Sequence, residues 1–385
     1  MKKIVALSVV SAVALFATNG DNLIGLGAKA RAMGGVGIAT YYGAENTLSN
    51  PALIAKSKGG EVAFGATYFA PTVKANGVKS SADTNVIPEV SVSEKINDAW
   101  AYGIGMYGSA GMGVDYRDYQ GTDPYLNMKA RTNLQLMKFA PAVAYHSGAL
   151  AVGVAPVVQY GNLDIAYYNI MSNKWVGQGS TEDFGLGFEA GLTYDLMENL
   201  RVGAVYKSSI SMTYDHTLSV ASAPFGMNIS DKLEQPAEYG IGLSYDMDNF
   251  TFAFDYKRIK WSDADGYKDF GWDDQDVYAI GAKYETDGYW AAVGFNYAQN
   301  PVANYATTAG NNPKAIMNTF NYLMFPATEE THYTAGAGAK ITEHLSLDFD
   351  IVYAPNKTVT TTGFAGPLTV KHQETSVAFS MRYDF

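Results

Sequence analysis

Apolar and polar residues alternate along most of this chain, in segments of about ten positions separated by turns. In 250–257, Phe or Tyr occupies every second position, and the intervening residues are Thr251, Ala253, Asp255 and Lys257. A period of two predicts strands with one apolar and one polar face. We predict fourteen strands, at approximately 61–74, 86–97, 99–109, 133–146, 149–161, 182–196, 199–215, 236–247, 249–261, 273–285, 288–298, 330–341, 344–355 and 370–385.

The connections between these strands alternate in length. Tight turns are predicted at 147–148, 247–249, 285–288 and 342–344. Long loops are predicted at 75–85, 110–132, 162–181, 216–235, 262–272, 299–329 and 356–369. Short turns at one end and long loops at the other are typical of outer membrane barrels. A secreted β-sandwich would also alternate, but soluble sandwiches do not usually sort their loops in this way.

The two faces of the predicted strands suit a membrane barrel. In 345–353, Leu345, Leu347, Phe349, Ile351 and Tyr353 share one face, and Ser and Asp residues share the other. An apolar face bounded by aromatic residues fits lipid outside, and a polar face fits a wet lumen. The sequence therefore predicts an all-β, antiparallel transmembrane β-barrel over residues 61–385.

The stretch 22–55 lacks this alternation and is rich in Gly and Ala. Fourteen strands enclose a lumen too wide for their own side chains to fill. We therefore expect residues 18–60 to form a hatch that plugs the lumen, with Gly34 and Gly35 allowing close backbone packing. A dinucleotide-binding loop is disfavoured, because Gly25 and Gly27 lack the third glycine of that motif and no crossover helix follows.

Residues 1–17 read as a secretory signal peptide, with Lys2 and Lys3 before an apolar run and Ala17 as the last residue before cleavage. Removing the two lysines leaves 27 − 2 = 25 basic against 38 acidic residues, a net charge of −13, which makes nucleic acid a poor partner. The chain has no cysteine, and its five histidines are scattered. We expect no metal site and no cofactor.

The last strand ends in alternating apolar residues and a terminal Phe385. This ending resembles the C-terminal signal recognised by the outer membrane assembly machinery, which we expect as a partner. No histidine lies in a recognisable constellation with Ser or Asp, so an enzyme is not predicted.

The segment GLGAKARAMGGVGIATYYGAENTLSNPALIA resembles the N-terminal hatch of the FadL-type (FadL/TodX) outer membrane transporters, above all in Asn50-Pro51-Ala52. That family takes up long-chain fatty acids and, in some members, aromatic hydrocarbons. The resemblance implies a monomeric outer membrane channel that captures a hydrophobic ligand in an extracellular groove and releases it laterally after the hatch rearranges. A general porin and a structural surface barrel remain alternatives.

Three sets of residues are candidates for these steps. Glycines in the third strand would bend it for lateral opening, or would thin the lumen face against the hatch: Gly105, Gly108 and Gly111. Apolar loop residues would form a ligand groove, or pack on each other: Phe225, Met227, Ile316, Phe320, Leu323 and Met324. Lys257 is the first candidate to bind a carboxylate, because its strand neighbours Ala253 and Ile259 carry no charge, although Asp255 lies two residues away on the same face. Lys207 is the second, because it is flanked by Val205 and Ser209 and has no acid on its own strand face.

Overall fold

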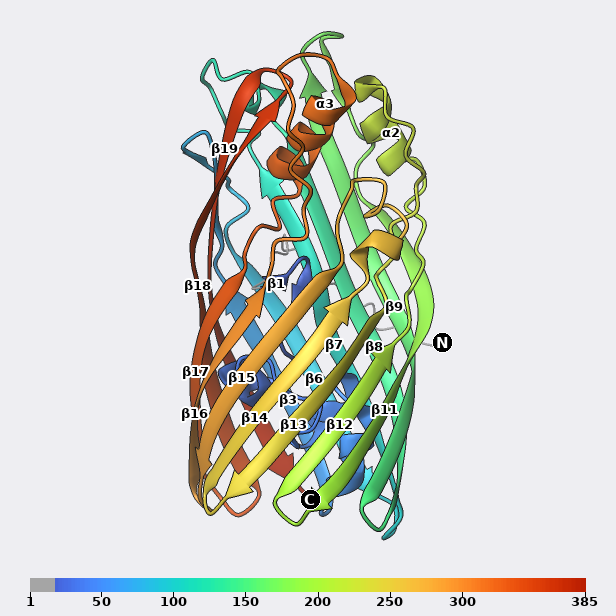
Figure 1. The fold of residues 1–385 in the computed structure, drawn as a ribbon, viewed down its shortest axis with the longest axis vertical. Coiled ribbons are helices and arrows are strands. Elements are labelled where there is room, and N and C mark those ends of the chain that lie inside the picture. The colour runs from blue at the N-terminus through green and yellow to red at the C-terminus, as the bar shows by residue number, and fades with distance from the viewer. Residues whose placement is uncertain (1–17) are drawn as a thin grey trace, which may run out of the picture.

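A computed structural model describes residues 18–385, and its fourteen long strands close into one antiparallel barrel (Figure 1). In order around the wall, the strands are β3 (Gly60–Phe69), β6 (Asn85–Lys95), β7 (Trp100–Asp115), β8 (Arg131–Ser147), β9 (Leu150–Asn169), β11 (Thr181–Met197), β12 (Leu200–Lys207), β13 (Glu238–Met247), β14 (Phe250–Ile259), β15 (Gln275–Glu285), β16 (Tyr289–Ala298), β17 (Thr331–Lys340), β18 (Leu345–Gly363) and β19 (Gly366–Asp384). β19 pairs with β3 and closes the ring. The predicted barrel is confirmed.

Five short strands complete the sheet. β4 (Thr72–Ala75) continues β3 and also pairs with β19, β5 (Val78–Lys79) pairs with β4, and β10 (Lys174–Val176) pairs with β9. β1 (Thr18–Asn19) and β2 (Asn22–Leu23) pair with each other inside the barrel. No helix of the described part of the chain is long and apolar enough to cross a membrane.

The two ends of the barrel differ as the turn pattern predicts (Figure 1). The connections β8–β9, β13–β14, β15–β16 and β17–β18 are the four predicted tight turns, and they lie at the end that carries the C-terminus. The opposite end carries the long loops, including the helices α2 (Leu218–Ser222) and α3 (Pro313–Thr319). In an outer membrane barrel, the end with long loops faces the outside.

The predicted loop 162–181 is wrong at its start, where β9 continues to Asn169. The predicted loop 356–369 is wrong throughout. β18 and β19 continue as a paired hairpin as far as Gly363 and Gly366. The sequence between residues 357 and 370 is rich in Thr and Val, whose β-branched side chains favour strands. The barrel wall therefore extends well beyond the predicted strand ends.

The predicted strand 199–215 is also wrong in its second half. β12 ends at Lys207, and the chain then turns into the lumen. Ile210 packs where a side chain at Gly185 or Gly187 of β11 would lie. The alternating segment pairs with the far end of its own connection rather than with the wall, since Ile210 pairs with Gln235 and both lie between β12 and β13.

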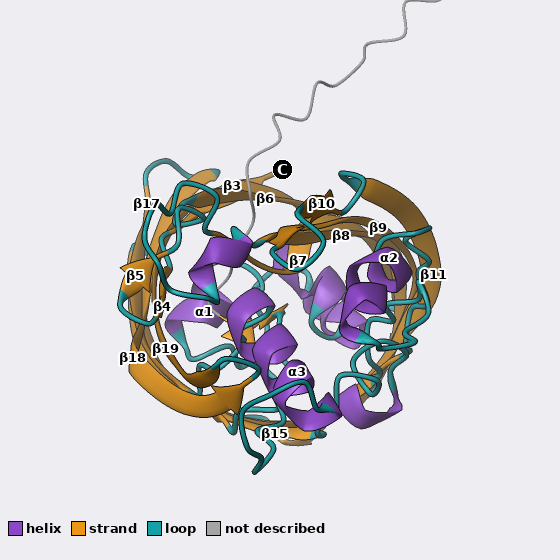
Figure 2. Ribbon diagram, turned by 90° about the horizontal axis from the view of Figure 1, so that it is seen from above, coloured by secondary structure: helices purple, strands orange, loops and turns teal. Residues whose placement is uncertain are grey.

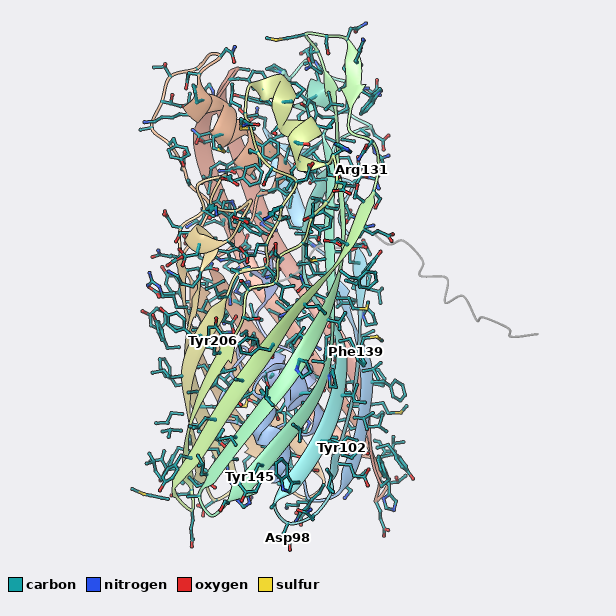
Figure 3. The ribbon with its side chains drawn as sticks, turned by 90° about the vertical axis from the view of Figure 1, so that its right-hand side faces the viewer. Asp98, Tyr102, Arg131, Phe139, Tyr145 and Tyr206 are labelled. Carbon is teal, nitrogen blue, oxygen red and sulfur yellow. The ribbon has the colours of Figure 1, made fainter. Side chains whose placement is uncertain are left out.

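The predicted faces are confirmed by exposure. Phe252 and Phe254 point outward and are 41% and 43% exposed, whereas Ala253 and Asp255 are buried inside. On another side of the wall, Tyr102, Phe139, Tyr145 and Tyr206 lie on the outer surface (Figure 3). Exposed aromatic residues on a barrel wall suit contact with lipid and its interfaces.

The N-terminal segment 18–59, here called the hatch, lies within the ring of strands (Figures 1 and 2). It contains α1 (Ala28–Ala32) and two 3-10 helices, Ala44–Leu48 and Pro51–Lys56. α1 packs against β16, β17 and β18, and Pro51–Lys56 packs against β8, β9 and β11. The hatch thus contacts opposite sides of the wall.

Candidate functional site

The hatch approaches the barrel wall through backbone rather than through side chains. Gly34 has a φ of 76°, and a Cβ on it would lie 2.6 Å from the carbonyl oxygen of Phe295 in β16. Its N–H donates to Thr334 Oγ1 at 2.9 Å, and its carbonyl accepts from Asn296 Nδ2 at 3.0 Å. Gly35 has a φ of 86° and lies against the carbonyl of Ile24. Only glycine fits both positions without strain.

The Asn50-Pro51-Ala52 motif caps a short helix and contacts two strands. Asn50 Oδ1 accepts from the N–H of Ala52 at 3.1 Å, and Pro51 occupies the first helical turn. The motif lies where side chains at Gly153 of β9 and Gly191 of β11 would be. Glycines in the wall therefore make room for the hatch.

A buried arginine joins α1 to two distant strands. Arg31 Nη1 lies 2.9 Å from Glu89 of β6, and Arg31 Nε lies 3.2 Å from Asp350 of β18. All three side chains are at most 5% exposed. Burial alone would lower the pKa of Arg31, but the carboxylates of Asp350 and Glu89 outweigh it and hold that pKa above its usual value. By contrast, Lys29 pairs at 3.0 Å with Glu285, which is 39% exposed.

β7 changes partner halfway along its length. It pairs with β6 only as far as the Glu89–Tyr107 pair, and a bulge follows between Gly108 and Ala110. Beyond the bulge, Ala110 pairs with β2 of the hatch, although β7 stays paired with β8. A bulge bends its strand. β7 therefore leaves β6 and leans on the hatch.

The three candidate glycines lie along this bend. A Cβ on Gly105 would meet Thr47 of the hatch, and one on Gly108 would lie 2.5 Å from Cγ2 of Ile87 in β6. The N–H of Gly111 donates to the carbonyl of Asp21 at 3.0 Å. Close packing against the hatch and a bent strand occur together here, so the two interpretations of these glycines are compatible.

Hatch side chains fill the space where β7 leaves β6. Ile24 is 1% exposed and, with Leu23 beside it, forms an apolar cluster with Phe69 of β3, Ile87 of β6 and Val352 of β18. Asp21, close by, is fully buried, and its carboxylate accepts a hydrogen bond from Tyr267. Burial raises the pKa of Asp21 to about 6, against the lowering effect of the hydrogen bonds from Tyr267 and Gln235.

A narrow cavity of about 70 Å³ lies between the hatch and the wall of β8, β11, β12, β13 and β14. Charged side chains line its wall: Lys138, Glu189, Lys207, Glu238, Asp255 and Lys257. Apolar hatch residues, including Leu23, Ile24 and Leu48, line its other side. The cavity therefore has the apolar and charged surfaces that an amphipathic ligand requires.

Most of these charges are paired. Lys138 Nζ lies 3.6 Å from Glu189, and Lys207 Nζ lies 3.4 Å from Glu238. Asp255 accepts hydrogen bonds from the N–H groups of Gly37 and Ile38 at 2.7 and 3.0 Å. The hatch backbone, and not a lysine, therefore satisfies Asp255.

Lys257 is the exception in this cavity. Its amino group makes no hydrogen bond and no ion pair with any residue of the range 18–385, although Glu238 and Asp255 lie near enough to interact electrostatically. Lys207, the other candidate, is paired across the sheet with Glu238 of β13. The residues beside Lys207 in its own strand do not reveal this ion pair, because its partner lies on the adjacent strand.

The candidate loop residues pack on one another. Ile316, Phe320, Leu323 and Met324 are at most 5% exposed. Phe320 stacks on Phe270 with ring centroids 4.9 Å apart and lies edge-on to Phe225 at 6.4 Å. Phe225 and Met227 are partly buried against the same core. In this structure Phe320, Leu323, Met324, Phe225 and Met227 form a closed apolar cap rather than an open groove, and Ile316 is buried outside that core.

This apolar cap is continuous with the hatch. One connected set of buried apolar side chains includes Phe320 and Leu323 of the cap, Leu136 of β8, and Leu48 and Ile54 of the hatch. It contacts the charged cavity at Leu48. Apolar surface therefore runs from the extracellular loops to the cavity.

Sequence reasoning did not single out Lys138 or Arg31. Lys138 faces the lumen in a strand whose neighbouring lumen-facing residues are apolar: Leu136, Ala140 and Ala142. A lone lysine on such a face is the signal that would have found it. Arg31 carried no such signal, since its partners are 58 and 319 residues away.

A family model for outer membrane transport proteins (OMPP1/FadL/TodX) matches residues 4–385. The chain belongs to this family. It is therefore an outer membrane protein of a family of transport proteins rather than of enzymes. The predicted FadL-type resemblance is confirmed.

Similar proteins agree with this assignment. A 47 kDa outer membrane protein of Pasteurella multocida is 23% identical over 387 residues, which cover 88% of this chain and 87% of that protein. A long-chain fatty acid transport protein of Escherichia coli is 24% identical over 256 residues, 57% of this chain and 56% of that protein.

Solved structures share the fold. A Pseudomonas aeruginosa FadL homologue has a TM-score of 0.72 at 14% identity, and covers 95% of this chain and 100% of its own. The toluene transporter TbuX of Ralstonia pickettii has a TM-score of 0.69 at 18% identity, with 94% and 99% covered.

Proposed function

We propose that this protein is an uptake channel for hydrophobic small molecules and that its ligands are long-chain fatty acids. A ligand enters from the extracellular loops, occupies the cavity beside the hatch, and leaves through the wall when the hatch rearranges. The fatty-acid assignment rests on the position of Lys257. Within residues 18–385 this cation has no ion-pair partner, and it lines a cavity whose other side is apolar.

A carboxylate in such a cavity needs a cation, because burial of an unpaired charge is costly. Lys138 and Lys207 are already engaged with Glu189 and Glu238. A ligand carboxylate at either site would have to displace an acid of the wall. At Lys257 it displaces no ion pair, so this lysine is the favoured contact.

The acyl chain is accommodated by the apolar core that links the loop cap to the hatch. Each buried CH₂ group contributes about 0.8 kcal/mol, so most of the affinity comes from the chain and the carboxylate contact sets selectivity. The loop cap is closed in this structure. Entry of a ligand therefore requires the side chains packed around Phe320 to separate. Met324 lies in this core, Met227 and Met317 pack against it, and flexible methionines suit ligands of variable shape.

The exit route of this proposal is the space between β6 and β7. The two strands stop pairing at Glu89–Tyr107, and Leu23 and Ile24 of the hatch fill the space beyond. Displacement of these two side chains joins the cavity, which they also line, to the lipid beside β6. The hatch is in this way both the plug and the gate.

Uptake of aromatic hydrocarbons is the second candidate. It is favoured by the toluene transporter among the proteins of similar fold, and by the aromatic cluster of Phe225, Phe270 and Phe320 in the loop cap. Such a ligand has no need of a cation. A general porin is disfavoured by the hatch, which occupies the lumen.

The test is replacement of Lys257 by Met, which keeps the stem of the side chain and removes its charge. Binding of oleate and of a hydrocarbon of equal chain length is measured on the purified protein by displacement of a fluorescent fatty acid. We expect Lys257→Met to weaken oleate binding about tenfold, or about 1.4 kcal/mol, and to leave the hydrocarbon unaffected.

Lys207→Met is the matched control, since its lysine lines the same cavity but is paired with Glu238. It should change oleate binding by less than Lys257→Met does. If Lys257→Met weakens the binding of both ligands equally, or of neither, Lys257 does not bind a carboxylate. An uncharged aromatic ligand would then be favoured.

A further inference from the structure

A buried cluster of two histidines and two glutamates lies between the hatch and the wall, away from the cavity described above. Glu374 of β19 is 1% exposed, and lies 3.4 Å from His332 of β17 and 3.2 Å from His372 of β19. Glu329, which precedes β17, lies 4.0 Å from the other side of His372. No group of three such side chains in residues 18–385 has an arrangement that could hold a metal ion.

The cluster is short of positive charge. Among the described residues no lysine or arginine pairs with Glu374, and Lys357, which lies opposite His372 in the hairpin, is paired with Glu330. A buried carboxylate without a fixed cation is costly. The cluster therefore has a place for one positive group.

The nitrogen of Thr18 occupies that place. It lies 3.1 Å from Glu374 Oε2 and donates to it, and Thr18 itself is 4% exposed. In the described part of the chain, the other oxygen, Glu374 Oε1, has only the imidazole of His372 near it, at 3.2 Å, and neither His332 nor His372 makes a hydrogen bond through its Nδ1. A single amide N–H can satisfy only one of these acceptors.

Thr18 is also the residue at which the signal-peptide pattern expects the processed chain to begin, since Ala17 is the predicted last residue before cleavage. Cleavage there converts the amide nitrogen into an ammonium group with three donors and a full positive charge. We infer that Glu374, with His332 and His372 beside it, is a binding site for the amino terminus of the processed chain. The proposal does not depend on the transported ligand.

The site explains how the front of the hatch is held. β1 pairs with β2, and β2 pairs with Ala110 of β7 just beyond the bulge. The amino terminus thus contacts β19 through Glu374. It is also connected to the bent strand β7 through the two residues of β2. Because Thr18 and Asn19 are both buried, a charge at the chain start requires a specific partner.

The experiment uses the full-length protein, exported to the outer membrane and purified in detergent. Mass spectrometry of the N-terminal peptide is expected to identify Thr18 as the first residue. The folded protein is then labelled near pH 7 with an N-hydroxysuccinimide ester, which favours an α-amine with a pKa of about 7.7–8.0 over lysine at about 10.4. Labelling of Thr18 is expected to be at least tenfold slower in the wild type than in Glu374→Gln.

Glu330→Gln is the matched control, because Glu330 is a neighbouring glutamate that pairs with Lys357 and not with Thr18. It should label as slowly as the wild type. A second variant, with one glycine inserted between Ala17 and Thr18, keeps Glu374 but moves the ammonium by about 3.5 Å. It should label as fast as Glu374→Gln, and it serves as the test if Glu374→Gln does not fold.

Retained heat-modifiable migration on a gel establishes that each variant is folded. A different first residue would overturn the proposal. So would equal labelling of the amino terminus in the wild type and in either folded variant, the inserted glycine being the first residue of the second one, or fast labelling in Glu330→Gln.

Discussion

The buried arginine of the hatch provides the sharpest test of how the plug is held. Arg31 makes four hydrogen bonds, two to Glu89 at 2.9 and 3.2 Å and two to Asp350 at 3.2 and 3.3 Å. Replacing it by Met leaves both carboxylates buried without a cation. Breaking one buried ion pair costs about 3–5 kcal/mol, and here two acids lose their partner, so we expect about 5 kcal/mol against the docked hatch.

That energy is large relative to the few interactions that dock α1. We expect Arg31→Met to open the lumen part of the time, and planar-bilayer recordings should show channel openings that the wild type lacks. Entry of a large antibiotic into cells that express the variant reports the same change. Lys29→Met is the matched control, because its partner Glu285 is 39% exposed and keeps Lys283 as a second partner, so this change should cost less than Arg31→Met.

The triple variant Arg31→Met, Glu89→Gln and Asp350→Asn separates charge from packing. It removes the unpaired carboxylates together with the arginine, so it should close the channel again to a large extent. If Arg31→Met conducts no more than the wild type, or if Lys29→Met conducts as much, the ion-pair network does not hold the hatch. If the triple variant leaks as much as Arg31→Met, shape rather than charge is the cause.

Three further predictions concern the plug, the wall and pH. Deletion of residues 22–55 should convert a closed barrel into one that conducts in planar bilayers; equal conductance with and without the segment would show that it is no plug. Replacing the outward-facing Phe252, Phe254 or Phe349 by Arg should lower the free energy of unfolding by about 2–4 kcal/mol near mid-bilayer, as measured by urea unfolding in lipid. Replacing Thr251 or Ser346 by Arg should lower it much less. Equal losses at both sets of positions would refute the face assignment. Because burial raises the pKa of Asp21 from 3.8 to about 6, its ionisation destabilises the folded state as pH rises from about 4 to 6. Asp21→Asn should therefore stabilise the protein by up to about 3 kcal/mol at pH 7 and hardly at pH 4, and an equal shift in Tm at both pH values would contradict this.

The sequence by itself determined the barrel. Strand number, the tight turns and the outward faces of strands such as β14 all follow from alternation, because the pleat sends successive side chains to opposite sides whatever the strand pairs with. The hatch was also recognisable, since a Gly- and Ala-rich segment without alternation cannot form a wall strand. Its glycines matched the tight contacts that they make, as at Gly34 against Phe295.

Only the tertiary structure decided which charges are free. Lys207 looked isolated along its own strand, yet register places Glu238 directly opposite it, and Lys257 keeps no ion pair because the hatch backbone takes Asp255. The same holds for segment 208–215, which reads as a strand but fills the lumen. Pairing register, strand bending and the filling of the lumen join residues hundreds of positions apart, and no local pattern along the chain records them.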